Sequence, residues 1–286
     1  MNIQSIACYV IMTLMPLVRC YSQDTDSLDR STKRSLYLDL GLGLGKFNYT
    51  DFGTSPLTFR GSSYAVSVNG LILDDSREIH FGLDYISGAA SNVVRNEVAV
   101  SQMYSIGIHY THMYRIKALS SEKWNTKLGG QINVLGELRY APAMQNADIG
   151  LDVFANILAS VKVTRDLSRI TPKEKKIWFI RYKLDPRKKN LSYQMNVGVI
   201  NHNLRNGYAY LGQSSVVNDF QLFDDYQFHT LSGFRMSSQL DYSYFLKNNN
   251  ALRLSYLWDA FNTGGDLNQF QMAYHTIKLA LLFNMK

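Results

Sequence analysis

Hydrophobic and polar positions alternate along much of this sequence, and the pattern is clearest in residues 35–49. Leucine fills every second position from Leu36 to Leu44, and the positions between hold tyrosine, aspartate or glycine. In a β-strand this spacing places all the leucines on one face, whereas on a helix the same residues scatter around the cylinder. The stretch therefore predicts a strand with one apolar face and one small or polar face.

The same alternation returns in many later segments. Apolar residues take every second position in residues 63–69, 78–85, 104–111, 124–140, 151–163, 178–184, 191–199, 207–217, 234–244, 252–259 and 277–285. Short turns are predicted at 74–77, 120–123 and 247–250, and loops at 50–57, 87–101 and 218–230. The total is twelve strands, or ten if residues 178–184 and 207–217 do not cross a membrane. The turns at 74–77, 120–123 and 247–250 lie on one side and are short, which favours twelve strands over ten strands with one long turn on that side.

An apolar face on so many strands must be covered by lipid or by a protein core. In lipid every backbone N–H and C=O must be paired, so such a sheet has to close into a barrel with no free edge. Several segments reach about ten residues, the length that crosses a bilayer at a tilt. The fold class we predict is all-β, an antiparallel up-and-down transmembrane barrel. An exported soluble β-protein that binds a ligand inside is the alternative.

The N-terminal segment predicts export. Residues 1–22 contain an apolar run at 6–18 that is too short for a membrane-spanning helix and is interrupted by Pro16. We therefore expect a signal peptide at 1–22, a polar periplasmic lead-in at 23–34, and the barrel at 35–286. Lipidation of Cys20 is the alternative reading of this segment.

The amino-acid composition limits the kinds of site that the predicted mature chain can form. The 286 residues include 13% aromatic and 19% charged side chains, and the two cysteines, Cys8 and Cys20, belong to the predicted signal segment. Cleavage there leaves a chain without disulfide, thiolate nucleophile or cysteine-ligated metal. Later residues contain no apolar run long enough for a transmembrane helix. The basic residues are dispersed rather than clustered, which argues against nucleic acid as a partner.

These features together resemble the outer-membrane β-barrel proteins of Gram-negative bacteria. The resemblance covers nearly the whole predicted mature chain and implies an outer-membrane location with lipid and lipopolysaccharide as neighbours. The last strand, 277–285, is similar to the signal that the barrel-insertion machinery reads in that superfamily. That signal usually closes with an aromatic residue, whereas here Phe283 precedes a terminal Lys286. The resemblance says little of function, because one barrel design serves pores, enzymes and adhesins.

The predicted inward positions carry the most informative chemistry. Acidic and basic groups are nearly balanced there, which predicts ion pairs across a narrow interior. The acidic positions are Asp39, Glu78, Asp84, Glu137, Asp152, Asp241 and Asp259, and the basic ones are Lys127, Arg139, Lys162, Arg181, Lys183, Arg235, Arg253 and Lys278. A barrel of ten to twelve strands is too small for an open aqueous channel. We therefore expect a plugged or narrowly gated lumen.

Phe270, Met272 and Tyr274 alternate on the parity opposite to the rest of the last strand. This predicts either a bulge near residues 275–276 or inward-facing aromatic residues above that point.

Enzyme and metal signatures are weak. His202 and His229 are the candidate residues for a lipase- or protease-like site at the external rim, but neither has a nucleophile or acid at the matching spacing. His109 and His112 are three apart and point to opposite faces of a strand, and His80 is expected beside Asp84 as a hydrogen-bonded interior residue. We therefore predict no catalytic, cofactor or metal site.

The function predicted from sequence is a non-enzymatic outer-membrane barrel, acting as a narrow or plugged, porin-like channel or as a surface or scaffold component of the cell envelope. A small solute or surface partner would bind through the external loops 87–101 and 203–230. An outer-membrane enzyme and a soluble ligand-binding protein are the alternatives.

Overall fold

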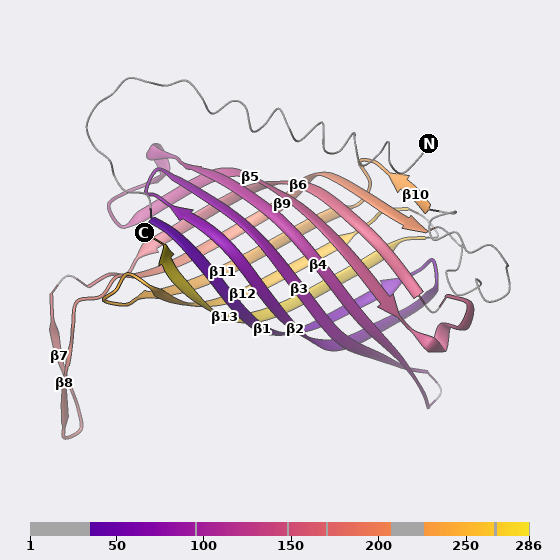
Figure 1. The fold of residues 1–286 in the computed structure, drawn as a ribbon, viewed down its shortest axis with the longest axis horizontal. Helices are drawn as coiled ribbons and strands as arrows, with labels where there is room; N and C mark the ends of the chain where they lie inside the picture. The colour runs from indigo at the N-terminus through magenta and orange to yellow at the C-terminus, as the bar shows by residue number, and fades with distance from the viewer. Residues whose placement is uncertain are drawn as a thin grey trace. The chain divides into compact units, whose positions relative to one another are not determined.

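Ten long strands of the computed structural model pair edge to edge until the last meets the first, which gives a closed antiparallel barrel (Figure 1). The structure describes residues 35–94, 96–147, 149–169, 171–206, 226–265 and 268–285. The barrel strands are β1 (Ser35–Asp51), β2 (Ser55–Leu73), β3 (Arg77–Val94), β4 (Glu97–Arg115), β5 (Trp124–Tyr140), β6 (Ile149–Asp166), β9 (Lys189–Asn206), β11 (Phe234–Phe245), β12 (Ala251–Asn262) and β13 (Phe270–Met285).

The predicted all-β closed barrel is confirmed, and its two ends can be told apart by topology. The terminal rim is the end where β1 begins and β13 stops; it carries the connections 74–76, 116–123, 167–188 and 246–250. The loop rim is the opposite end and carries 52–54, 95–96, 141–148, 207–233 and 263–269. The tight turn predicted at 74–77 is present, with the N–H of Asp74 donating to the carbonyl of Arg77 at 3.0 Å.

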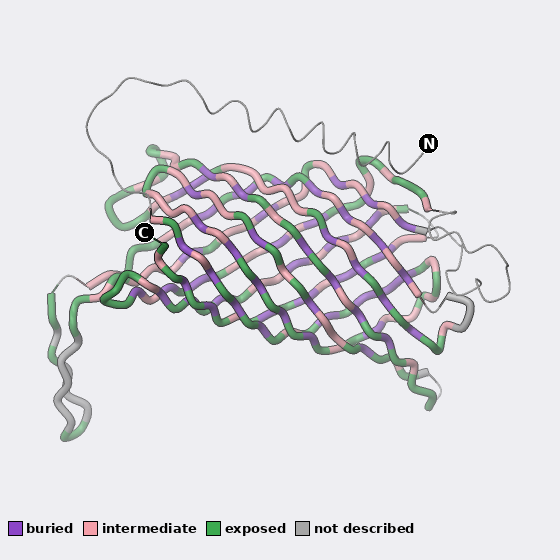
Figure 2. Tube along the Cα trace, viewed as in Figure 1, coloured by how far each residue is buried: buried purple, intermediate pink, exposed green. Residues whose placement is uncertain are grey.

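Exposed and buried residues alternate along the barrel strands (Figure 2). Leu42 and Leu44 are 68% and 69% exposed on the outer wall, whereas Asp39 and Gly41 between the leucines are buried inside. The outer wall is therefore lined by aliphatic and aromatic side chains, whereas the interior holds small and polar side chains together with clusters of buried apolar ones. This is the distribution that a lipid-facing barrel requires.

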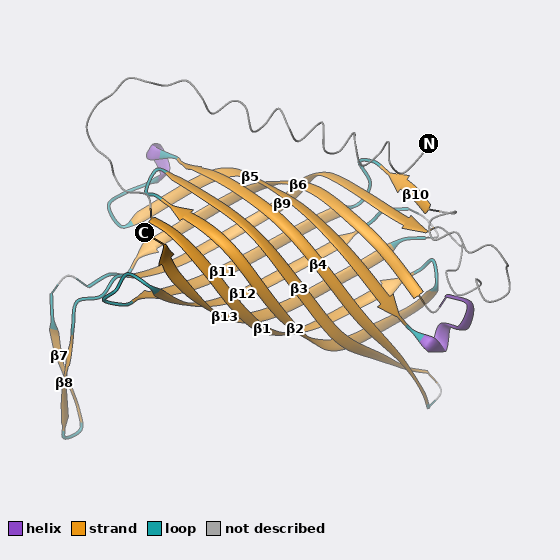
Figure 3. Ribbon diagram, in the orientation of Figure 1, coloured by secondary structure: helices purple, strands orange, loops and turns teal. Residues whose placement is uncertain are grey.

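The prediction of twelve strands is wrong, and ten is the observed number. Of the two extra candidates, residues 178–184 overlap a separate hairpin in which β7 (Lys173–Ile177) pairs only with β8 (Ile180–Leu184) (Figure 3). These strands are five residues long and rich in lysine and arginine, so they are too short and too charged to span a bilayer. The other candidate, 207–217, lies outside the described residues.

Two predicted loops are strand instead. Residues 87–101 form the ends of β3 and β4, which stay paired until Val94 lies opposite Glu97. Part of 218–230 is β10 (Tyr226–His229), a short strand that pairs with β9 beyond the end of β11. It is not one of the ten barrel strands. Because β3 and β4 remain hydrogen-bonded beyond the apolar band, the long external loop expected at 87–101 is absent.

The aromatic residues of β13 face inward. The pairing of β13 with β1 is continuous through His275 and Thr276, without the bulge that was one of the two expectations. Phe270, Met272 and Tyr274 are buried in the interior, where they join a cluster that also includes Tyr49, Phe59, Phe154 and Phe261. Buried aromatic side chains therefore occupy the interior of the described loop-rim half of the barrel.

The remaining elements are two short 3-10 helices, η2 (Lys117–Leu119) and η3 (Pro142–Ala147). No helix among the described residues is long and apolar enough to span a membrane. The chain divides into two units, Met1–Lys33 and Arg34–Lys286, and every described residue lies in the second. The predicted signal peptide and lead-in at 1–34 lie outside the described residues.

Candidate functional site in the barrel interior

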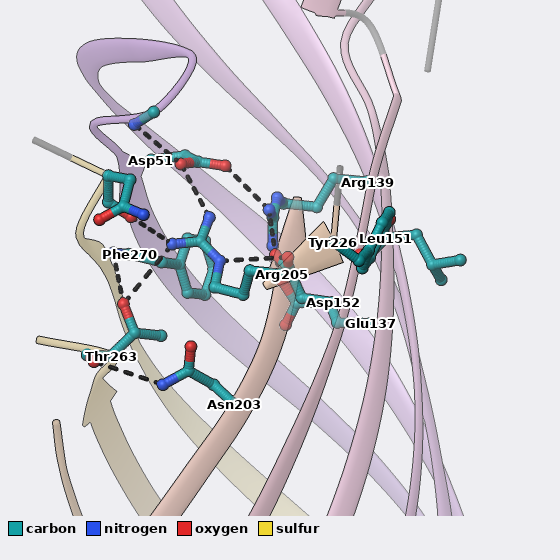
Figure 4. A network of polar contacts seen from close by, with 12 residues as sticks. Asp51, Glu137, Arg139, Leu151, Asp152, Asn203, Arg205, Tyr226, Thr263 and Phe270 are labelled. Atoms are coloured by element: carbon teal, nitrogen blue, oxygen red, sulfur yellow. Dashed lines mark hydrogen bonds and ion pairs between the residues drawn. The ribbon is translucent and has the colours of Figure 1, made fainter. Parts of the chain in front are cut away.

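The barrel interior carries charged side chains at three levels, and the largest group lies near the loop rim. We call this group, Asp51, Glu137, Arg139, Asp152 and Arg205, the loop-rim network (Figure 4). All five residues are buried, none more than 5% exposed. They come from β1, β5, β6 and β9, so the network joins strands that are not all neighbours in the sheet.

Two guanidinium groups hold the network together. Nη2 of Arg139 donates to Oδ2 of Asp51 at 2.9 Å and to Oδ2 of Asp152, and Nη1 donates to Glu137. Arg205 reaches the other oxygen of each aspartate, Oδ1 of Asp152 at 3.1 Å through Nε and Oδ1 of Asp51 at 2.9 Å through Nη2. Each aspartate therefore bridges both arginines, an arrangement in which buried charges offset one another.

Phe270 supports both arginines from within the interior. The guanidinium carbon of Arg139 lies 4.1 Å from the centre of its ring, and that of Arg205 lies 5.0 Å from it. Phe270 itself is fully buried. Cation–π contacts gain strength when water is excluded, so the aromatic cluster and the loop-rim network stabilise one another.

Polar contacts connect the network to the loop-rim connections. Nη1 of Arg205 donates to the carbonyl of Asn268 at 2.6 Å, in the connection between β12 and β13. In β10, the hydroxyl of Tyr226 donates to the carbonyl of Leu151 at 2.7 Å. Burial and, secondly, the charge of Asp152 raise the pKa of Tyr226 to about 12, so this hydroxyl remains a donor at neutral pH.

The middle level contains two smaller groups. Arg235 forms a bidentate ion pair with Asp259, at 3.2 and 2.8 Å, and the hydroxyl of Tyr274 donates to the same carboxylate at 3.0 Å. Asp84 lies 3.0 Å from Nδ1 of His109 and 3.9 Å from Nζ of Lys278. A cavity of about 100 Å³ lies between these groups and has room for a few water molecules.

The level near the terminal rim holds a further set of predicted residues. Glu78 accepts from Nζ of Lys127 at 3.2 Å and from Nζ of Lys162. Nη1 of Arg253 donates to Oδ2 of Asp39 at 3.0 Å. A hollow of about 460 Å³ opens here and is lined by Glu78, Lys127, Lys162 and Arg253 among others.

Asp241, also part of this hollow, accepts from Nε2 of Gln239 at 2.8 Å. Like Asp241, every other charged residue that the sequence places inward on a barrel strand lies on the inner side of the wall. Arg181 and Lys183 do not, because β8 is not a barrel strand.

Two residues of the loop-rim network were not predicted from the sequence. Asp51 was assigned to a loop, because β1 was expected to end at residue 49. Arg205 was not predicted because residues 203–230 were expected to form an external loop, whereas β9 continues to Asn206. A β-bulge at Val199, where Gly198 pairs with Leu158 and Ile200 with Ile157, turns Arg205 inward. The consecutive apolar residues Val199 and Ile200, followed by polar residues at 201, 203 and 205, were the available signal.

The histidines considered for an enzyme site lie apart from this network. The ring of His202 stacks on Phe228 of β10, with ring centres 5.7 Å apart, and its buried Nδ1 has no hydrogen-bond partner. His229 pairs through its backbone with Asn203 at the loop rim. Within the described ranges, no group of three His, Cys, Asp or Glu side chains is arranged to hold a metal ion.

No family model and no curated protein matches the chain, but solved structures of similar fold are found. The transport unit of the autotransporter AIDA-I from Escherichia coli is 10% identical over 96% of both chains, with a TM-score of 0.43. The translocator domain of the autotransporter NalP from Neisseria meningitidis is 10% identical over 99% of this chain and 98% of that one, with a TM-score of 0.37. The Pseudomonas putida toluene transporter TodX is 8% identical over 90% and 92%, with a TM-score of 0.30. At these scores the similarities assign neither a subfamily nor an activity.

The architecture itself is that of an outer-membrane β-barrel. An even number of antiparallel strands closes completely, the outer wall is apolar, and the buried charged side chains lie inside. Only a closed barrel satisfies every backbone hydrogen bond of a sheet in lipid, and this type of barrel belongs to the outer membrane. The predicted fold is confirmed, and its closed form and apolar outer wall support the predicted outer-membrane localisation.

Proposed function

We propose that this protein is a plugged outer-membrane barrel that serves as a non-enzymatic envelope component rather than as an open pore. The observation that carries the proposal is the packing of aromatic rings and ion pairs in the described loop-rim half of the interior. There the fully buried Phe270 lies beneath Arg139 and Arg205, whose guanidinium groups are held by Asp51 and Asp152. To pass, a solute would have to displace the aromatic ring as well as the ion pairs.

The energetic cost of opening supports the same proposal. Separating a guanidinium from its carboxylates in a buried site leaves both charges unpaired, and breaking one such pair costs about 3–5 kcal/mol. Displacing a packed aromatic ring adds a cost of the same order. Thermal opening of this level is therefore rare, and the resting barrel conducts little.

A gated narrow channel is the second candidate, favoured by the unequal filling of the two halves. The hollow at the terminal rim measures about 460 Å³ and the cavity in the middle about 100 Å³, whereas the described loop-rim half holds the aromatic cluster. A ligand or force acting at the loop rim would then need to open one level only.

Planar-bilayer recording of the purified, folded protein tests both candidates. For a plugged barrel we expect no steady conductance, and for a gated one brief openings from a closed baseline. The variant Arg205→Ala should raise the open fraction, while Arg115→Ala, which removes an exposed pair with Asp75 at the terminal rim, should leave it unchanged. A steady ohmic conductance of the unmodified protein would contradict the plug.

The enzymatic alternative has its own test. Lipase and protease assays on the folded protein, compared with His202→Ala and His229→Ala, should show no activity that depends on either histidine. We also propose that lipid and lipopolysaccharide contact the outer wall and that the insertion machinery recognises β13. Of the two segments proposed to bind a solute or surface partner, 87–101 is strand rather than loop. The other, 203–230, is strand at 203–206 and 226–229, and its residues 207–225 lie outside the described residues.

A further inference from the structure

Two inward-facing histidines, His80 on β3 and His109 on β4, point their ring nitrogens at one another inside the barrel. Their Nε2 atoms lie 3.4 Å apart, with ring centres separated by 4.6 Å and ring planes at 82°. The strand register places His80 opposite Thr111 and His109 opposite Gly82, so the two rings are diagonal neighbours on one face. The sequence alone drew attention to His109 and His112, which lie on opposite faces.

Asp84 fixes the orientation of one ring. Its Oδ2 lies 3.0 Å from Nδ1 of His109, so Nδ1 carries the hydrogen and the unprotonated Nε2 of His109 faces Nε2 of His80. A carboxylate behind an imidazole is the usual support of a metal-binding histidine, because it sets the tautomer and the ring direction. The other oxygen of Asp84 faces Lys278 at 3.9 Å, which places the carboxylate between that ammonium group and the ring.

Asn69 supplies a third group at the same place. It is 2% exposed, and neither Oδ1 nor Nδ2 has a hydrogen-bond partner. Asn69, Gly82 and His109 lie side by side across β2, β3 and β4, and a Cβ at Gly82 would collide with Oδ1 of Asn69 and with the His109 ring. A buried amide without partners costs free energy, so its oxygen is available to a ligand.

We propose that His80, His109 and Asn69 form a binding site for a divalent transition-metal ion of the zinc class. Zinc–nitrogen distances of about 2.0–2.1 Å at a tetrahedral centre place two ligand nitrogens roughly 3.3 Å apart. The observed 3.4 Å between the Nε2 atoms matches this spacing and exceeds the usual length of an N–H···N hydrogen bond. Two imidazoles with one amide oxygen suit zinc, copper or nickel rather than calcium or magnesium.

The surroundings leave room for a fourth ligand. His80, Asp84 and His109 line the cavity of about 100 Å³, which has room for a metal-bound water. Glu78, the preceding inward residue of β3, lines the hollow at the terminal rim. The histidines therefore lie on the terminal-rim side of the loop-rim network.

Metal binding by the folded, detergent-solubilised full chain without an affinity tag tests the site. Co²⁺ serves as the probe, because its visible absorption reports a four-coordinate site, and Zn²⁺ is added to displace it. We expect about one Co²⁺ per chain, displaced by Zn²⁺. His80→Ala and His109→Ala should lose the absorption band. His112→Ala is the matched control, because that histidine lies on the same strand but faces outward beside Tyr114, and it should bind as the unmodified protein does.

Two further variants separate a positioning role from mere stability. Asp84→Asn should weaken binding by about 10–100-fold without abolishing it. Gly82→Ala should reduce binding although it changes no ligand. Heat-dependent gel mobility reports folding of each variant, and His80→Gln replaces His80→Ala if the latter fails to fold. Absence of a cobalt band in the unmodified protein, or an equal band in a folded His80 variant, would overturn the proposal.

Discussion

Nη2 of Arg205 lies 2.9 Å from Oδ1 of Asp51, although the two residues are 154 positions apart in the chain. Arg205 belongs to β9 and Asp51 to β1, and neither strand pairs with the other. The contact therefore spans the interior instead of running along the wall. Together with Arg139 and Asp152 it forms a buried network across the interior near the loop rim.

Removal of this link should destabilise the barrel. Arg205→Ala leaves Asp51 and Asp152 with one partner fewer in a buried site, and we expect a loss of about 3–5 kcal/mol in the free energy of unfolding. Urea titration in lipid vesicles measures it. Arg115→Ala is the control, since its pair with Asp75 is exposed and should contribute about 0–1 kcal/mol. Equal losses for the two variants would show that the network carries no special stability.

The bulge at Val199 lets β9 carry one residue more than its partner β6 while Arg205 still faces inward. Deletion of Val199 makes Gly198 and Ile200 consecutive opposite Leu158 and Ile157, so residues 201, 203 and 205 keep facing inward. We expect this deletion variant to form the folded, heat-modifiable band on a gel. Insertion of one alanine after Asn201 instead turns residues 203 and 205 toward the outer wall, places an arginine against lipid, and should prevent the band. An insertion variant that folds normally would mean that β9 tolerates either register.

The aromatic filling of the interior makes its own prediction. Phe270 is fully buried, and Phe270→Ala should cost about 3–5 kcal/mol and increase bilayer conductance, because it removes the ring beneath both arginines. Phe283→Ala changes the same residue type on the outer face of the same strand, where the ring is 36% exposed. That control should leave conductance unchanged, and a similar rise in both variants would contradict the plug.

A charge on the outer leucine face tests the contact with lipid. Leu40 lies on the apolar stripe of β1, and Leu40→Arg should cost about 2–4 kcal/mol where the residue is near the middle of the bilayer. Asn48→Arg places the same charge on the same face but beyond the leucines, and should cost about 0–1 kcal/mol. Vesicle-based unfolding compares the two. A negligible cost at Leu40 would remove this face from lipid.

The glycines of β1 illustrate what the sequence predicted about this strand and what it left open. The stretch 35–49 predicted an outer leucine face and an inner side of small or polar residues. In the structure, a Cβ at Gly41 would lie 3.0 Å from Cδ of Lys278, which occupies the space beside that glycine. Alternation decided the faces, but pairing of β1 with β13 decided which side chain fills the gap.

The sequence by itself determined the β-class, the apolar outer wall and the charged inner positions, because side-chain alternation has a fixed period of two in every strand. It did not determine the strand number, since a charged hairpin such as β7 and β8 shows the same period as a barrel strand. The loop-rim network and the pairing of His80 with His109 depended on the register between strands and on the bulge in β9. These are relations between distant segments, and only the closed barrel fixes them.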